Sequence, residues 1–223
     1  MSGRIQVTPD LLLRAYSIGL FPMAETRDAS SIFWIDPERR GVLPLDRFHV
    51  PRRLRRTVRR SSYTITCDTD FDRVIEGCAQ ITDDRRDTWI NDEIRHLYRE
   101  LFRRGLVHTL EVRNGDELVG GLYGVALGSV FFGESMFSRV RDASKIALVH
   151  LAARLHHGGF TLLDTQFITP HLAQFGAIEV PRRTYRDMLN RALQRSAAFP
   201  IDLSIAALEE YLTLSAERAE APP

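Results

Sequence analysis

The sequence VHTLEVRNGDELVGGLYGVALGSVFFGESMF, residues 107–137, contains three apolar runs rich in β-forming residues in close succession. We predict a β-strand for each run, over residues 107–113, 117–127 and 129–137. Asn114-Gly115 is a strong hairpin signal between the first two runs, because both residues tolerate the positive φ angles of a tight turn. Gly128 can make the second turn. The segment therefore predicts three consecutive strands joined by short turns.

Helices and short strands follow on the C-terminal side of this segment. Asp142 can start a helix with an apolar face that runs to Gly158-Gly159. Beyond it we predict a buried strand, a helix, a last strand and a C-terminal helix, over residues 160–164, 169–176, 178–180 and from Pro181 onward. We expect the end of the chain, SAERAEAPP (215–223), to be frayed.

Capping residues mark further helices on the N-terminal side. Thr8, Asp70 and Asn91 can each accept free backbone N–H groups at a helix start. We expect helices over residues 8–19, 71–80 and 91–105, and strands over residues 31–35 and 63–67. From residue 62 the predicted order is β-α-α-β-β-β-α-β-α-β, which indicates an α+β fold.

The composition is that of an ordinary globular protein. The chain has 223 residues, of which 44% are hydrophobic and 26% charged, enough to bury a core without disulfides or metal. The net charge of +1 excludes a histone-like protein that coats polyanions. Of the 30 basic residues, 29 are Arg and only Lys145 is a lysine. Codon usage in a GC-rich genome explains this bias, although guanidinium groups also suit phosphate recognition.

The cysteines and the termini bear on location and metal binding. Cys67 and Cys78 are eleven residues apart and form no C-x-x-C pair, and no Cys/His group has the spacing of zinc ligands. The N-terminus lacks the apolar segment of a signal peptide, and no run is apolar enough to span a membrane. We expect a cytoplasmic protein with two buried thiols, no metal and no cofactor.

The segment PRRLRRTVRR, residues 51–60, concentrates positive charge in one place. On a helix, Leu54 and Val58 share a face and the arginines cover the rest. One interpretation of this segment is a solvated basic face. Six arginines without a carboxylate among them repel one another, so binding to an anionic partner is the better interpretation. Nucleic-acid phosphate is the natural candidate for that partner.

The order of elements from residue 62 matches the acyltransferase fold typified by the GCN5-related N-acetyltransferases, with its mixed, mostly antiparallel sheet. This analogy favours acyl transfer to an amine. Acetyl-CoA users of that fold hold the pyrophosphate with a glycine-rich loop before a helix. The corresponding loop here, SRVRDA (138–143), has no glycine, so another molecule must deliver the acyl group.

Four segments together resemble one family. They are FPMAE (21–25), FWIDPERRGVLPLDRFHV (33–50), TWI (88–90), and the long block GGLYGVALGSVFFGESMFSRVRDASKIALVHL (120–151) followed by DTQFITPHLAQFGAIEVPRR (164–183). They closely resemble the leucyl/phenylalanyl-tRNA–protein transferases of bacteria, over about residues 9 to 195. The resemblance implies transfer of Leu or Phe, and Met less well, from aminoacyl-tRNA to proteins with N-terminal Arg or Lys. The product is then degraded by the N-end rule. We expect a small N-terminal α/β domain over residues 1–60 and an acyltransferase-like catalytic domain over residues 61–223.

Asp164 and Gln166 are the catalytic pair by this resemblance. The reaction is aminolysis of a reactive ester, which needs orientation and help with one proton rather than a covalent intermediate. Two residues apart on a strand, the side chains should share a face. We expect Asp164 to polarise Gln166, whose carbonyl oxygen accepts a hydrogen bond from the attacking amine. Asp164 as a free general base is less favoured, because an ordinary aspartate is a weak base near neutral pH. A strand-end Asp that caps the next loop is the alternative.

Glu134 lies in the otherwise apolar strand VFFGESMF, where a carboxylate is costly unless it is paired. The resemblance suggests that it binds the basic N-terminal residue of the acceptor protein. The alternative is a structural ion pair with Arg139 or Arg141.

An apolar pocket for Leu or Phe is also implied by the resemblance, although each member could equally be plain core. Its candidate members are Leu122, Phe131, Met136, Leu148, Leu151, Leu155 and Leu163. Phe131 and Met136 have opposite parity on their strand, so a bulge must separate them if both line the pocket.

The two tryptophans, Trp34 and Trp89, are implied to stack on the 3′-terminal adenosine of the tRNA, with core packing as the alternative. The acceptor-stem phosphates would be bound by Arg52, Arg53, Arg55, Arg56, Arg59 and Arg60.

Two other functions remain open. An acyl-CoA N-acyltransferase would show a melting temperature that shifts with CoA thioesters. An RNA-binding module without activity would need the arginines and tryptophans but not Asp164, Gln166 and Glu134.

Overall fold

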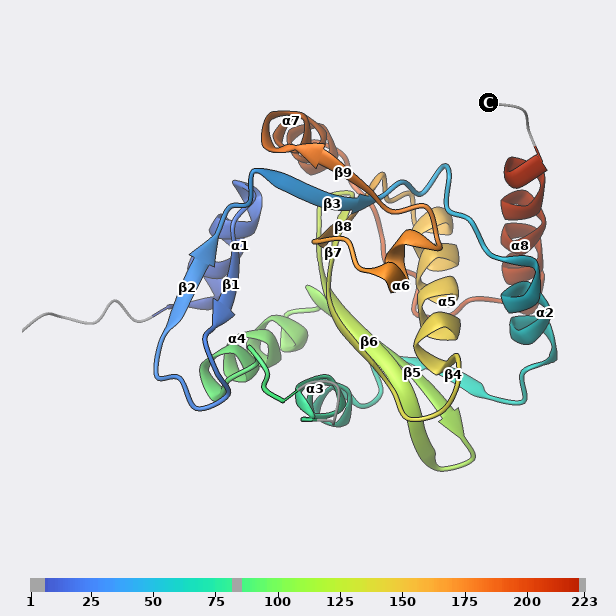
Figure 1. Ribbon diagram of the computed structural model, residues 1–223, viewed down its shortest axis with the longest axis horizontal. Coiled ribbons are helices and arrows are strands. Elements are labelled where there is room, and N and C mark those ends of the chain that lie inside the picture. The colour runs from blue at the N-terminus through green and yellow to red at the C-terminus, as the bar shows by residue number, and fades with distance from the viewer. Residues whose placement is uncertain (1–6, 82–85, 221–223) are drawn as a thin grey trace, which may run out of the picture.

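The computed structural model describes residues 7–81 and 86–220. The chain folds as α+β around a seven-stranded mixed sheet in the order β4-β5-β6-β7-β8-β3-β9 (Figure 1). Only β7 and β8 pair in parallel; the other neighbours are antiparallel. The strands are β3 (Arg39–Leu43), β4 (Thr64–Cys67), β5 (Val107–Asn114), β6 (Glu117–Leu127), β7 (Val130–Ser138), β8 (Leu162–Gln166) and β9 (Ile178–Pro181). The predicted fold class, α+β with a mixed and mostly antiparallel sheet, is confirmed.

The three predicted central strands form as β5, β6 and β7, and the predicted turns join them. Gly115 and Gly128 have φ angles of +57° and +59°, which an L side chain adopts only with strain. The elements from residue 62 to 181 occur in the predicted order, with the helices α3 (Phe71–Ala79), α4 (Asp92–Arg103), α5 (Ala143–His157) and α6 (Pro170–Ala173).

Strand β7 carries a bulge at Glu134. Across from it on β6, Tyr123 pairs with Ser135 and Gly124 pairs with Gly133, so Glu134 has no partner in the ladder. The extra residue reverses the alternation of side chains beyond it. As a result Phe131 and Met136 pack toward the same face of the sheet, as the pocket prediction required.

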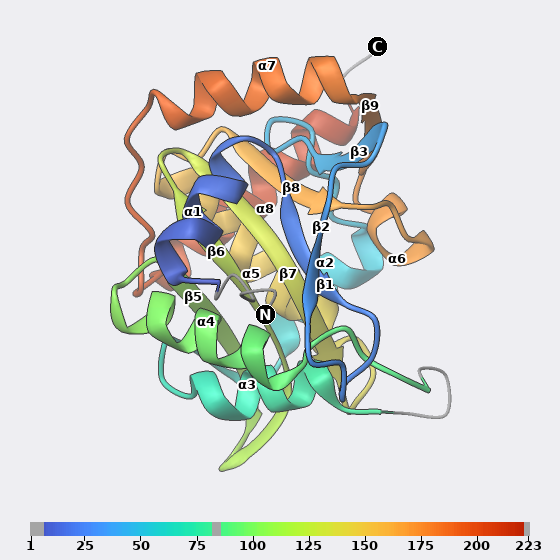
Figure 2. The same cartoon turned by 90° about the vertical axis from the view of Figure 1, so that its left-hand side faces the viewer.

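Helices cover both faces of the sheet (Figures 1 and 2). On one face α5 packs with α2 (Arg52–Arg60) and α8 (Ile205–Glu220). On the other face α3 and α4 pack with α1 (Pro9–Ser17) and α7 (Arg182–Leu193). A separate antiparallel pair, β1 (Phe21–Ala24) and β2 (Ile32–Ile35), lies beside α1. Cys67 and Cys78 are both buried, as predicted, and form no disulfide among the described residues.

Three elements were not predicted, namely β1, β3 and α8. The prediction that the end of the chain is frayed is wrong as far as residue 220, because α8 packs against α5. The buried Ser215 hydroxyl donates to the Phe48 carbonyl and accepts from the Val50 amide. Strand β3 precedes the predicted domain boundary at residue 60, yet it lies between β8 and β9 in the main sheet. The boundary itself stays a prediction.

Candidate active site

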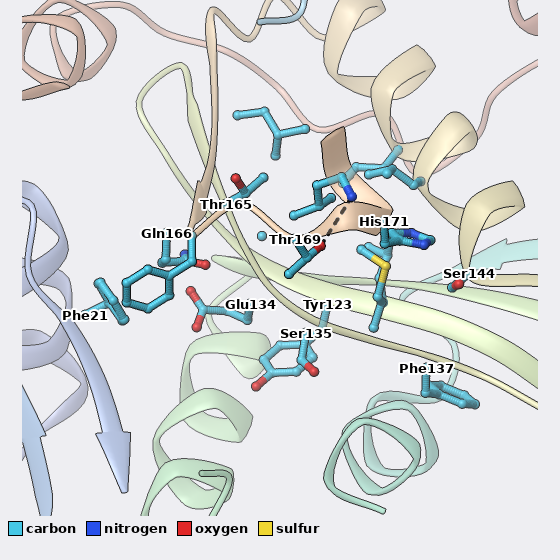
Figure 3. A pocket seen from close by; sticks show the side chains of 18 of the residues that line it. Phe21, Tyr123, Glu134, Ser135, Phe137, Ser144, Thr165, Gln166, Thr169 and His171 are labelled. Atoms are coloured by element: carbon cyan, nitrogen blue, oxygen red, sulfur yellow. Dashed lines mark hydrogen bonds between the residues drawn. The ribbon is translucent and has the colours of Figure 1, made fainter. Parts of the chain in front are cut away.

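A cavity of about 430 Å³ opens where β7 and β8 separate. Their parallel ladder ends at the pair Phe132 and Asp164. Just beyond it, residues 133–138 of β7 and 165–167 at the end of β8 form opposite walls. Figure 3 shows Phe21, Glu134 and Gln166 at one end of the cavity, and His171 and Ser144 at the other.

Glu134 is held in the cavity wall by two tyrosines from other elements. The Tyr16 hydroxyl of α1 donates to Oε1 at 2.6 Å, and the Tyr98 hydroxyl of α4 donates to Oε2 at 2.8 Å. The two hydroxyls also contact each other. Burial raises the pKa of Glu134 to about 7, against the opposing effect of both tyrosine hydrogen bonds. The carboxyl group can therefore exist in both charge states near neutral pH.

The tyrosines remain donors at any physiological pH. Burial, followed by the nearby Glu134 carboxylate, raises the pKa of both Tyr16 and Tyr98 well above 10. The alternative of a structural ion pair at Glu134 is wrong. Arg139 donates to the Leu118 carbonyl, and Arg141 lies beside Asp142.

Asp164 is fully buried behind the cavity wall. Arg40 holds its carboxylate with two nitrogens, Nε at 2.9 Å from Oδ1 and Nη2 at 2.7 Å from Oδ2. The Tyr185 hydroxyl donates to Oδ2 at 2.5 Å, and the backbone N–H of Gln166 donates to Oδ1 at 2.9 Å. The predicted contact between the Asp164 carboxylate and the Gln166 side-chain amide is not made. Gln166 has a φ of +56°, so the strand geometry behind that prediction ends there.

Four polar atoms of residues that line the cavity are buried without a hydrogen-bond partner among the described residues. They are Tyr123 Oη, Thr165 Oγ1, Gln166 Nε2 and His171 Nε2. An unpaired buried polar atom costs roughly 1–3 kcal/mol, so such atoms around one cavity indicate a ligand with polar groups. Burial, helped by Lys145, lowers the pKa of His171, which favours a neutral imidazole.

Most of the predicted apolar pocket lines this cavity. The lining residues are Leu122, Met136, Leu148, Leu151 and Leu163. The prediction that Phe131 and Leu155 line the pocket is wrong. Both side chains are fully buried, but neither lines the cavity. Phe131 packs against Phe160 and Phe199, and Leu155 belongs to the core on the same face of the sheet.

The two tryptophans differ in position. Trp89 lines the cavity, whereas Trp34 lies outside its wall. Trp34 is half-buried and pairs with Pro22, which does line the cavity. Phe21 and Met23 also line it, and no role was predicted for them. They lie in FPMAE, a motif of the resemblance, which was the only signal available for them.

The predicted basic helix forms as α2. Leu54 and Val58 are buried, while five of its six arginines are exposed and Arg55 is half-buried. Arg59 pairs with Glu209 of α8 at 2.8 Å, so this arginine has a protein partner. A second hollow of about 540 Å³ is lined by Arg53, Arg141 and Lys145 among others. Ser138 and Ser144 line both hollows, so the basic surface continues into the apolar cavity.

Within the described ranges, no helix combines the length and the apolar composition needed to cross a membrane.

Comparisons with known proteins agree with the resemblance of the motifs. The sequence profile described as leucyl/phenylalanyl-tRNA protein transferase matches residues 42–190, and that of the N-terminal domain of the same enzymes matches residues 6–38. A leucyl/phenylalanyl-tRNA–protein transferase of Paramagnetospirillum magneticum is 58% identical, over 90% of this chain and 96% of its own. The transferase of Caulobacter vibrioides is 59% identical, over 86% and 88% of the two chains. That of Nitrobacter winogradskyi is 57% identical, over 92% of each. The chain therefore belongs to the leucyl/phenylalanyl-tRNA–protein transferase family and is an aminoacyltransferase.

Proposed function

We propose that this enzyme transfers Leu or Phe, and Met less well, from aminoacyl-tRNA to proteins with N-terminal Arg or Lys. The observation that carries the proposal is one cavity that joins a leucine-rich wall to the Glu134 carboxylate and to the Gln166 amide nitrogen, which has no partner among the described residues. The leucine-rich wall suits an apolar side chain, the Glu134 carboxylate suits a cation, and the Gln166 amide suits the reacting ester.

The aminoacyl side chain occupies the apolar part of the cavity. Leu148 and Leu151 of α5, Leu122 of β6 and Leu163 of β8 supply branched walls. Met136 adds an unbranched side chain, which adapts to ligands of different shape. Burial of a Leu or Phe side chain there contributes roughly 1.5–3 kcal/mol, and a polar side chain would gain no partner from these residues.

Glu134 binds the cationic side chain of the acceptor. An Arg or Lys beside the carboxylate favours its ionised form, so binding lowers the pKa from about 7. The two tyrosine hydroxyls keep one lone-pair direction of each oxygen occupied and fix the carboxylate plane. This arrangement accounts for a preference for a basic N-terminal residue.

The reaction is a direct aminolysis. The neutral α-amine of the acceptor attacks the ester carbonyl, so the new C–N bond forms while the bond to the ribose 3′ oxygen breaks. The amine proton passes to that departing oxygen. Gln166 accepts a hydrogen bond from the attacking amine through its carbonyl oxygen, and its unpaired Nε2 donates to a substrate oxygen. Asp164 does not touch the substrates and acts through the backbone of Gln166.

The tRNA lies across the basic surface beside the cavity. Trp89 of the cavity wall stacks on the 3′-terminal adenosine, and Trp34, which pairs with the lining residue Pro22, adds a second contact. The arginines of α2 bind acceptor-stem phosphates, which tolerates different tRNA sequences. Arg141 and Lys145 extend this surface toward the cavity.

We further propose a domain division for the enzyme, a fate for its product and a location for the reaction. Residues 61–223 form an acyltransferase-like catalytic domain, and residues 1–60 form a smaller N-terminal unit that contributes strand β3 to the main sheet. The product acquires a destabilising N-terminal residue and enters N-degron degradation. The reaction takes place in the cytoplasm, where charged tRNA and the acceptors meet.

Incubation of the enzyme with tRNA charged with labelled Leu and a peptide with N-terminal Arg tests this function. The label should move to the peptide, and pretreatment of the charged tRNA with RNase should abolish the transfer. Binding of tRNA without any labelled peptide would refute an enzymatic role and favour an RNA-binding module.

A further inference from the structure

We propose that Arg40 and Tyr185 are positioning residues for the transfer reaction. Acting through the Asp164 carboxylate, they hold Gln166 in its reactive conformation. They also fix the position of β1 relative to Gln166. The inference rests on the proposed role of Gln166. Neither residue lines the cavity, so neither is a catalytic residue itself.

The Asp164 carboxylate is saturated by fixed donors. Arg40 occupies both oxygens, Tyr185 occupies Oδ2 and the Gln166 backbone N–H occupies Oδ1. All of the side chains concerned are buried. Burial and the adjacent Asp164 raise the pKa of Tyr185 above any physiological pH, so its hydroxyl always donates. A carboxylate held by these donors stays in place, which suits a rigid support for Gln166.

Gln166 needs such a support because of its backbone. Its φ of +56° lies in the left-handed region, which a residue with a Cβ adopts at a cost unless its surroundings require it. The hydrogen bond from its N–H to Asp164 is one such requirement. Strand β3 supplies another, since Gly41 pairs with Gln166 and a Cβ on Gly41 would lie 2.6 Å from the carbonyl carbon of Phe167. Arg40 is the preceding residue of the same strand.

Arg40 also contacts the β1 side of the cavity. Its Nη1 donates to the Gly19 carbonyl at 2.9 Å, at the end of α1. Its guanidinium lies between the rings of Phe21 and Tyr185, 4.5 Å from each centroid. Phe21 lines the cavity, and Gly19 leads directly into β1. One guanidinium thus connects the β1 wall with the Gln166 wall, so its planar geometry has a role that a lysine could not fill.

The variant Tyr185→Phe removes only the hydroxyl and keeps the ring that stacks on Arg40. We expect its single-turnover rate constant for Leu transfer to fall between about 10-fold and 100-fold, as for a misplaced catalytic group. The KM values for aminoacyl-tRNA and for the Arg peptide should stay within about twofold of wild type, because Tyr185 touches neither substrate. Tyr211→Phe is the matched control, since Tyr211 is a buried tyrosine of α8 whose hydroxyl has no partner among the described residues.

The variant Arg40→Lys should reduce the same rate constant, since an ammonium group cannot hold Asp164, Gly19 and the two rings together. Arg39→Lys serves as its control, because Arg39 is the exposed neighbour that pairs with Glu179. The amplitude of the single turnover reports the folded fraction, whereas its rate constant does not. A reduced amplitude with a wild-type rate constant in both Tyr185→Phe and Arg40→Lys would therefore mean a merely structural role and overturn the proposal.

A double-mutant cycle separates this inference from the proposed function. If Gln166→Ala leaves the rate constant unchanged, the proposed role of Gln166 fails. If Gln166→Ala lowers it, Tyr185→Phe should have no further effect in the Gln166→Ala background. An equal reduction by Tyr185→Phe in both backgrounds, or no reduction in either, would overturn the positioning role while the role of Gln166 stands.

Discussion

Replacing Glu134 with Gln should stabilise the protein at alkaline pH while it impairs acceptor binding. An amide has nearly the shape of the carboxyl group, and its carbonyl oxygen can still accept from Tyr16 or Tyr98. The substitution removes the charge that burial disfavours. It therefore isolates the energetic cost of keeping this carboxylate in the cavity wall.

The magnitude follows from the raised pKa of Glu134. Because the folded protein binds this proton more tightly than the unfolded chain does, the stabilising contribution is complete below pH 4.5 and is lost as the pH rises through about 7. The difference between 4.5 and about 7, at about 1.36 kcal/mol for each pH unit, amounts to at most about 3 kcal/mol. Relative to wild type, the Glu134→Gln variant should gain up to this amount in unfolding free energy between pH 5 and pH 8.

Urea denaturation of both proteins across this pH range measures the difference directly. Glu25→Gln is the control, because it removes an exposed carboxylate of the same kind. The control should leave the pH dependence as in wild type. A difference between Glu134→Gln and wild type that is constant with pH would show that burial does not raise the pKa of Glu134.

The same variant should raise the KM for a peptide with N-terminal Arg. A peptide with N-terminal citrulline, which has the shape of Arg without its charge, should be affected much less. If the KM for the Arg peptide is unchanged, Glu134 does not bind the acceptor cation.

Three further predictions concern the tRNA and the aminoacyl pocket. Substituting Arg52, Arg53 and Arg56 with Ala should reduce the slope of log Kd against log salt for tRNA binding by about 2 to 3, and an unchanged slope would place the phosphates elsewhere. Trp89→Ala should weaken binding of an aminoacyl-adenosine analogue roughly 5- to 150-fold. Trp34→Ala should weaken it less, because of the two tryptophans only Trp89 lines the cavity. Equal effects of the two substitutions would contradict this difference. Leu148→Phe should narrow the pocket and raise the ratio of kcat/KM for Leu transfer to kcat/KM for Phe transfer by about tenfold or more. Leu155→Met, which lies outside the lining, should leave this ratio unchanged. A ratio unaffected by Leu148→Phe would mean that the aminoacyl side chain binds elsewhere.

Local sequence patterns predicted much of the fold because the relevant forces are local. The Asn114-Gly115 turn, the Thr8 cap and the Leu54/Val58 pair each determine an element through neighbouring residues, and each element formed as expected. Strand β3 was missed because Arg39-Arg40-Gly41 lacks β propensity, and only its pairing with β8 and β9 makes it a strand.

The sequence motifs predicted several of the side chains that line the cavity, but not the contacts that these side chains make. Glu134 and Gln166 were named from motifs, yet the tyrosines that hold Glu134 lie 118 and 36 residues away along the chain. No role was predicted for Arg40, although it is almost fully buried and pairs with a carboxylate 124 residues distant. The pocket list failed at Phe131 and Leu155 because the deep core and the cavity wall have the same apolar composition, and only depth distinguishes them.

The product formed on peptides that differ only in their first residue tests the proposed aminolysis most directly. Mass spectrometry after incubation with Leu-tRNA should detect one Leu joined by a peptide bond to the α-amine of peptides beginning with Arg or Lys. The adduct should be scarce on the citrulline peptide and absent when the α-amine is acetylated. Absence of the adduct on the Arg peptide, or equal modification of the acetylated peptide, would contradict aminolysis in this cavity.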